Sequence, residues 1–206
     1  MTLEEAIAKI KPLDHNAMEI AQKRWDSIAK PLHSLGKLET LLIQIAGITG
    51  NAEVDLSRRG LIAMCADNGV VEEGVTQTGQ EVTAIVAENF LKYDTSVGVM
   101  CKQNHAEIFP VDMGMVTDTK VRTDHKIAYG TQNMTKGPAM TREQAVKGLE
   151  AGIDMVRELN DKGYRILATG EMGIGNTTTS SAVASVLLKQ PVEEMTGRGA
   201  GLTSEG

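Results

Sequence analysis

The chain has 206 residues, of which 41% are hydrophobic and 23% are charged, and its formal net charge at pH 7 is −6. This composition indicates a folded protein rather than a disordered one, and no apolar run approaches the ~20 residues that a membrane-spanning helix needs. The acidic surplus argues against nucleic-acid binding through a basic surface. The two cysteines, Cys65 and Cys101, are too few for a disulfide scaffold or a cysteine-rich metal site. We therefore expect a cytoplasmic protein with no metal ion or other cofactor and with no nucleic-acid or membrane partner.

The first fifty residues have helical periodicity. Apolar side chains recur at intervals of three and four over residues 3–10, 16–29 and 37–46. No strand pattern is obvious here, and a Pro/Gly loop at residues 30–38 joins the second helical stretch to the third. We predict that residues 1–50 form part of a small helical domain.

From residue 60 onward, short apolar runs alternate with helical stretches. The predicted strands and helices are, in chain order, residues 61–65, 80–91, 96–103, 106–112, 141–161, 164–168 and 178–188. A capping box of Thr141 and Gln144 marks the start of the longest helix. The alternation is typical of an α/β fold, a doubly wound, mostly parallel sheet with helices on both faces. We predict a Rossmann-like α/β nucleotide-binding domain over residues 51–206, incomplete at its C-terminus because the final Gly-rich stretch leads into no further element.

The clearest candidate site is GEMGIGNTT, from Gly170 to Thr178, between an apolar strand and a helix. A Gly-rich turn lets backbone N–H groups approach an anion, and the helix N-terminus adds partial positive charge. The stretch nearly matches the phosphate loop of nucleoside triphosphatases, but Asn176 stands where that loop has lysine, which disfavours such an enzyme. The pattern favours a phosphate or carboxylate site; the alternative is a structural turn capped by Asn176 or Thr177. Glu171 suits a site in which it faces hydroxyl groups such as those of a ribose.

Carboxylates gather in a second stretch, residues 65–75, which follows the first predicted strand. Asp67, Glu72 and Glu73 are candidates for binding a metal ion or acting as bases, with an acidic, solvated turn as an equal alternative. Their spacing does not match a calcium-binding EF-hand loop. Cys65 ends an apolar strand with no histidine close in sequence, so we interpret it as a buried thiol rather than a nucleophile.

Five stretches, in this order, resemble the nicotinate-nucleotide:dimethylbenzimidazole phosphoribosyltransferases of cobalamin nucleotide-loop assembly. They are KPxxSLGKLE, CADNGVxxEGVTxxxQEVT, GTxNMTxxPAMTxEQA, GEMGIGNTTTSSA and GRGAGLTSEG, and the match runs from about residue 21 to residue 206. The resemblance implies a homodimer that transfers 5-phosphoribose from nicotinate mononucleotide to 5,6-dimethylbenzimidazole or a related base. The products are α-ribazole 5′-phosphate and nicotinate. Members of this family are considerably longer than the present chain.

The resemblance also implies roles for individual residues. Those that match the nucleotide- and phosphate-binding loops are Glu171, Gly173, Gly175, Asn176, Thr177, Thr178 and Gly201. Those that fall where the family lines its benzimidazole pocket are Met64, Asp67, Thr78 and Val86. Those that match the signature loop of the small domain are Pro31, Ser34, Leu35 and Gly36. The chain departs from the family pattern at Asn68, where histidine is more usual, and at Gly79, where proline is common.

The resemblance further implies that the general base is not present in this chain. In the family, the carboxylate that accepts the benzimidazole proton and a lysine that helps to hold the phosphate both lie in the C-terminal third. We therefore expect Glu171 to serve the ribose side of an oxocarbenium-like transition state, with little or no turnover by these 206 residues alone. The alternative hypothesis is a nucleotide- or phosphate-binding fragment, or an assembly module, that lacks the catalytic base.

Overall fold

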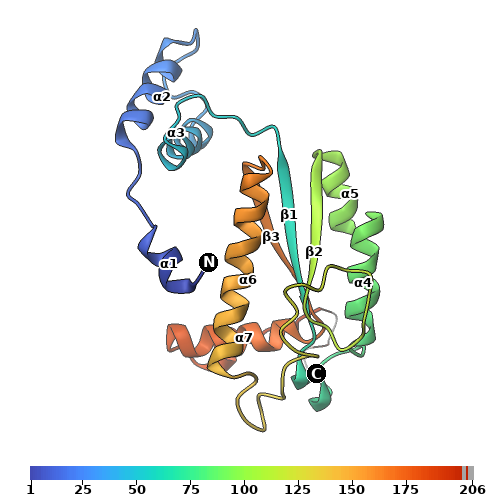
Figure 1. The fold of residues 1–206 in the computed structure, drawn as a ribbon. Helices are drawn as coiled ribbons and strands as arrows, with labels where there is room; N and C mark the ends of the chain where they lie inside the picture. Colours follow the sequence, from blue (N-terminus) through green and yellow to red (C-terminus); the bar gives the residue numbers. More distant parts are fainter. Residues whose placement is uncertain (201–202, 204–206) are drawn as a thin grey trace. The chain divides into compact units, whose positions relative to one another are not determined.

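A computed structural model describes residues 1–200 and residue 203 of the chain. They form two compact units, a small one over Thr2–Arg58 and a large one that begins at Arg59 (Figure 1). The small unit is helical, whereas the large unit combines strands and helices. Within the described residues, none of the helices has the length and apolar character needed to span a bilayer.

The small unit consists of helices that pack through small side chains. Its helices are α1 (Leu3–Ala8), α2 (His15–Ser27) and α3 (Lys37–Thr49). The carboxylate of Asp14 caps α2 by accepting the N–H of Ala17. Ala17 and Ala46 are buried, and a Cβ on Gly47 would lie 2.7 Å from the side chain of Met18, so α2 and α3 approach closely. These elements confirm the helical character predicted for this part of the chain.

The large unit is built on a parallel sheet. Its strands are β1 (Arg59–Ala66), β2 (Ala106–Gly114) and β3 (Ile166–Met172). They lie in the order β2-β1-β3, and both pairings are parallel, as predicted. The predicted third strand differs in its bounds, because the pairing of β3 with β1 continues to Cys65 and Met172. Glu171 is therefore part of a strand and not of the turn that follows it.

Helices cover both faces of this sheet, which confirms the predicted fold class (Figure 1). The helices of the large unit are α4 (Glu81–Lys92), α5 (Ser96–Gln103), α6 (Arg142–Asp161), α7 (Asn176–Leu188) and α8 (Val192–Met195). Alternate side chains of β1 enter different cores. Ala63 and Cys65 pack with Phe90 of α4, whereas Ile62 packs with Met155 of α6. The strand is apolar on both sides because each side faces a helix.

The helix starts can be compared with the predicted caps. α6 begins with the predicted capping box between Thr141 and Gln144. α7 begins at Asn176, two residues earlier than predicted, because Gly175 takes a left-handed conformation with φ of 87° and is itself the N-cap residue. The alternative in which Asn176 or Thr177 caps this helix is therefore wrong. A 3-10 helix, η1 (Gly69–Glu73), occupies the acidic stretch after β1 and was not predicted.

Candidate functional site

The glycine turn lies where the winding of the sheet reverses. From β1 the chain passes through α4 and α5 to β2, and from β2 it passes through α6, on the opposite face, to β3. β1 and β3 are thus the neighbouring strands between which open α/β sheets bind their ligands, just beyond the carboxyl ends. The segment after β1 and the turn from Gly173 to Gly175 meet there, since the Asn68 side-chain amide donates to the carbonyl oxygen of Ile174 at 3.1 Å.

The turn leads into α7 without a side-chain cap on the helix. Within the described residues no side chain accepts a hydrogen bond as the cap of α7, because the N-cap residue is Gly175. The helix has 13 residues, so the backbone N–H groups of its first turn carry the partial positive charge typical of a helix N-terminus. This arrangement suits an anion such as a phosphate group.

A cavity of about 290 Å³ opens beside this helix N-terminus. Three segments line it, namely the loop of residues 75–78, the turn with the start of α7, and residues 196–200. The predicted nucleotide-binding residues that line it are Gly173, Gly175, Asn176, Thr177 and Thr178. Gly201, the remaining glycine of the prediction, lies outside the described residues. Arg198 also lines the cavity and was not predicted. Its position between Gly197 and Gly199 in the Gly-rich stretch that resembles a family loop was the available signal.

Glu171 lies beside the cavity rather than in its lining. Its carboxylate accepts a hydrogen bond from the side-chain amide of Asn176, which does line the cavity. Partial burial raises the pKa of Glu171, and the hydrogen bond from Asn176 opposes that shift. Glu171 therefore orients Asn176 at the edge of the cavity.

The four residues predicted for the benzimidazole pocket do not lie together. Thr78 lines the cavity with the glycine turn. Met64 packs against the core on the α6 face of the sheet, and Val86 packs against the core on the α4 face. Asp67 is 0% exposed, and its carboxylate accepts the N–H of Val116 at 2.8 Å. Among the four, the structure therefore places only Thr78 at the surface of this cavity.

The signature loop predicted for the small domain connects α2 to α3 in the small unit. Lys30 precedes Pro31 and forms an ion pair at 2.9 Å with Glu39 of α3. The same carboxylate accepts the N–H of Leu35 at 3.0 Å, and Glu39 is buried. These contacts fix the loop, which also contains the predicted residues Ser34 and Gly36.

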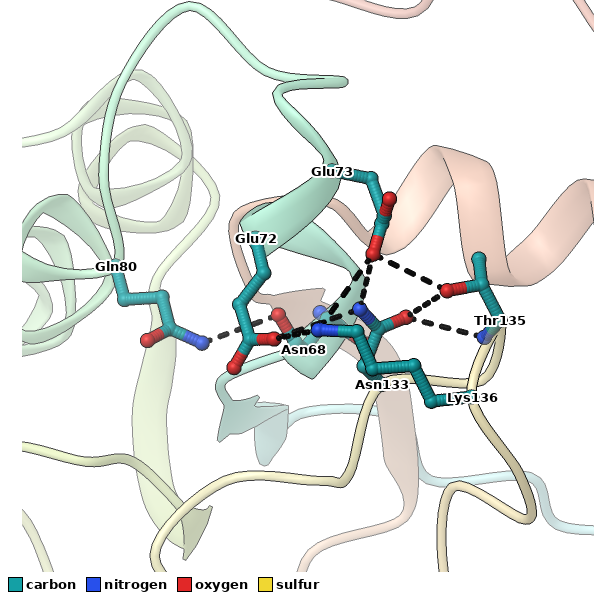
Figure 2. Close-up of polar contacts among 7 residues, drawn as sticks. All are labelled: Asn68, Glu72, Glu73, Gln80, Asn133, Thr135 and Lys136. Carbon is teal, nitrogen blue, oxygen red and sulfur yellow. Dashed lines mark hydrogen bonds and ion pairs between the residues drawn. The ribbon is translucent and has the colours of Figure 1, made fainter.

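The acidic stretch after β1 is tied to a neighbouring loop. Lys136 forms an ion pair at 2.8 Å with Glu72, and Glu73 accepts hydrogen bonds from Asn133 at 2.5 Å and from Thr135 at 3.1 Å (Figure 2). The ammonium group of Lys136 lowers the pKa of Glu72. Within the described residues no cluster of three or more His, Cys, Asp or Glu side chains is arranged to hold a metal ion. The two glutamates therefore anchor η1.

Cys65 is a buried, unreactive thiol, as predicted. Its side chain is inaccessible, and burial together with the Glu171 carboxylate raises its pKa to about 12. A thiol with this pKa carries almost no thiolate at neutral pH, and the thiolate is the nucleophilic form. Cys65 therefore contributes to the core on the α4 face of the sheet.

Asp67→Asn should stabilise the protein more at pH 7 than at pH 4.5. Burial raises the pKa of Asp67, so the folded state binds a proton more tightly than the unfolded state does. The wild-type protein then loses stability as the pH rises from the pKa of Asp67 in the unfolded state through its pKa in the folded state. The side-chain amide of the Asp67→Asn variant does not ionise, so the variant does not lose this stability. We expect the Tm difference from wild type to grow by about 2 °C or more over this range.

Thermal unfolding across that pH range measures this effect. Asp26→Asn, which changes an exposed aspartate of α2, serves as the matched control and should show no such trend. A Tm difference for Asp67→Asn that shrinks as the pH rises would contradict the assignment of a raised pKa.

The fold and the cavity define a class of α/β proteins in which a glycine-rich strand-to-helix turn lies at the switch point of a parallel sheet. A model of the phosphoribosyltransferase family matches residues 10–206. The chain belongs to this phosphoribosyltransferase family, in agreement with the resemblance seen in its sequence.

Named relatives and solved structures agree with this assignment. The chain is 51% identical over 208 residues to the nicotinate-nucleotide--dimethylbenzimidazole phosphoribosyltransferase of Ruminiclostridium cellulolyticum, covering 100% of this chain and 59% of the relative. The protein of the same name from Clostridium tetani is 47% identical, with 99% and 57% covered. The crystal structure of CobT from Thermus thermophilus is similar with a TM-score of 0.84 and 35% identity, covering 92% of this chain and 58% of that one. The chain thus spans just under three fifths of the length of these relatives.

Proposed function

We propose that this chain supplies the nucleotide-binding part of an enzyme that transfers 5-phosphoribose from nicotinate mononucleotide to 5,6-dimethylbenzimidazole or a related base. The products are α-ribazole 5′-phosphate and nicotinate. The observation that carries the proposal is the cavity at the start of α7, which five of the nucleotide-binding residues implied by the family resemblance line together. The reaction named for the relatives from R. cellulolyticum and C. tetani supports it.

The residues around the cavity suit the separate parts of the nucleotide. The 5′-phosphate would bind the first N–H groups of α7, with the glycine turn allowing close approach and Arg198 adding positive charge. The ribose hydroxyls would face Asn176 and the Glu171 carboxylate behind it. A carboxylate on that side also stabilises positive charge that develops on the ribosyl carbon.

The chemistry requires a base that the described residues lining the cavity do not supply. Nicotinate leaves from a pyridinium, so its departure neutralises the ring and needs no general acid. The attacking benzimidazole becomes cationic and must lose the proton on its other ring nitrogen, which a carboxylate accepts well. Of the described residues that line the cavity, none is Asp or Glu. This favours the second candidate function, a binding fragment or assembly module, for the chain acting alone.

The proposal also includes a homodimer and a cytoplasmic location. A homodimer is supported by large apolar side chains that α7 leaves exposed, namely Val183, Val186, Leu187 and Leu188. A cytoplasmic location is supported by two free, buried cysteines. The assignments of Met64, Asp67, Val86 and the small-domain loop to the base-binding side, and of residues 51–206 to a Rossmann-like nucleotide domain, remain part of this proposal.

Calorimetric titration with nicotinate mononucleotide, together with a turnover assay, tests this function. We expect the purified chain to bind nicotinate mononucleotide and to release no nicotinate when dimethylbenzimidazole is added, with products followed by chromatography and mass detection. Product above background would show that a base exists within the chain and would overturn its assigned absence. Failure to bind nicotinate mononucleotide would overturn the proposed nucleotide site itself.

A further inference from the structure

We propose that Asn68 and Thr83 are positioning residues that hold the peptide groups of Ile174, and thereby set the affinity of the cavity for a phosphorylated ligand. The identity of that ligand rests on the proposed function, whereas the positioning itself rests on contacts within the chain. Ile174 is the middle residue of the glycine turn and lines the cavity. Neither Asn68 nor Thr83 lines it, so both act through the turn.

Asn68 connects the glycine turn to two other elements. Its side-chain N–H donates to the carbonyl oxygen of Ile174 at 3.1 Å, and its side-chain oxygen accepts from the hydroxyl of Thr179 in α7 at 3.4 Å. Its backbone oxygen accepts from the side-chain amide of Gln80, next to α4, at 3.0 Å (Figure 2). A Cβ on Gly173 would lie 3.0 Å from the Asn68 nitrogen, so the side chain rests directly against the turn.

Thr83 binds the backbone N–H of Ile174, the polar group that Asn68 does not contact. It is fully buried in α4, and its hydroxyl oxygen accepts the N–H of Ile174 at 3.1 Å. The N–H of Ile174 is thus bound from α4, and its C=O is bound from the segment after β1. Neither side chain belongs to β3 or α7, the strand and helix that flank the turn. Rotation of either peptide group would break a partly buried hydrogen bond, which fixes the turn before any ligand arrives.

The segment that carries Asn68 is itself anchored. The N–H of Gly69 donates to the Thr131 hydroxyl at 3.0 Å, and a Cβ on Gly69 would lie 2.6 Å from the backbone of residues 131–133. Glu72 and Glu73 contact the loop that contains Asn133 and Lys136, and these contacts hold η1, which directly follows Asn68 (Figure 2). Asn68 therefore acts from a fixed position, which is what a positioning residue requires.

This arrangement explains how the turn can present backbone N–H groups to an anion at low cost. A turn that is fixed in advance loses little conformational entropy when the ligand binds. If the turn were free to rotate, its N–H groups would point at the phosphate for only part of the time, and the apparent affinity would fall in proportion.

Hydrogen exchange and ligand binding, measured on the same set of variants of the 206-residue chain, test the inference. The variants are Asn68→Ala, Thr83→Val, Thr83→Ser, which keeps the hydroxyl, and Asn104→Ala, which removes an exposed side-chain hydrogen bond at the end of α5. The probes are nicotinate mononucleotide and inorganic phosphate. We expect Asn68→Ala and Thr83→Val each to speed amide exchange at residues 173–177 and to weaken binding by about three- to tenfold. Thr83→Ser and Asn104→Ala should stay close to wild type.

Each outcome supports or overturns the inference. Because both side chains hold one residue, the double variant should weaken binding by less than the product of the two single effects. Unchanged exchange at the turn, or faster exchange with unchanged affinity, would overturn the positioning role. If Thr83→Val fails to fold, Asn68→Ala decides. A wild-type chain that binds phosphate but not nicotinate mononucleotide would overturn the proposed function alone, and phosphate would then report the effect of the variants.

Discussion

Gly173→Ala is expected to weaken nucleotide binding by roughly 100-fold while leaving most of the fold in place. A Cβ at this position would lie 2.3 Å from the carbonyl oxygen of Ala66, 2.7 Å from the Glu171 carboxylate and 3.0 Å from the Asn68 side chain. The contact with Ala66 involves backbone of β1, which cannot move aside without disturbing the sheet. The turn must shift instead, and its N–H groups move with it. A displacement near 1 Å costs roughly 100-fold in affinity at a site that depends on fixed geometry.

Titration with nicotinate mononucleotide measures this loss, and thermal unfolding shows whether the variant is folded. Overpacking at the turn should lower stability by about 1–3 kcal/mol. Gly170→Ala is the matched control, because it lies three residues earlier and its added Cβ would meet the nearest atom, in Leu61, at an ordinary 3.5 Å. Equal affinities for the two variants would show that the close approach of Gly173 to β1 does not govern binding.

The fold could be predicted from the sequence where local signals coincide with long-range pairing. β1 was recognised because its residues are apolar on both sides, which is what a strand between two helical layers requires. α6 was recognised because its capping box and its periodicity agree. The bounds of β3 were missed at both ends, since they depend on how far the strand pairs with β1 and not on its own pattern.

The candidate site could be predicted only in part. The glycine turn is a local motif, and its position between a strand and a helix is readable from the sequence. The contacts that hold it are not, because Asn68 and Thr83 lie 106 and 91 residues from Ile174 along the chain. Arg198 reaches the cavity from a segment with no regular pattern. The acidic stretch could not be distinguished from a metal site until Glu72 and Glu73 were seen to contact Lys136 and Asn133.

Asp112→Ala should destabilise the large unit by about 3–5 kcal/mol, the usual cost of removing one partner of a buried ion pair. Asp112 ends the apolar part of β2 and is 0% exposed. One of its oxygens accepts the N–H groups of Gly114 and Met115 at 2.9 and 2.8 Å, and the other lies 3.1 Å from the ammonium group of Lys126. The variant leaves two buried donors unpaired and a largely buried cation without its buried partner.

The second ion pair of Lys126, with Asp118, provides the control for this prediction. It also contacts Asp118 at 3.3 Å, but the side chain of Asp118 is 77% exposed, and such pairs contribute about 0–1 kcal/mol. Thermal unfolding should therefore show a Tm loss of roughly 10 °C or more for Asp112→Ala and little change for Asp118→Ala. Asp112→Asn, which keeps an acceptor for the two N–H groups but loses the charge, should fall between them. Similar Tm losses for Asp112→Ala and Asp118→Ala would mean that burial does not decide the strength of the ion pair. A much larger loss for Asp112→Ala would establish Asp112 as the residue that joins β2 to the loop carrying Lys126.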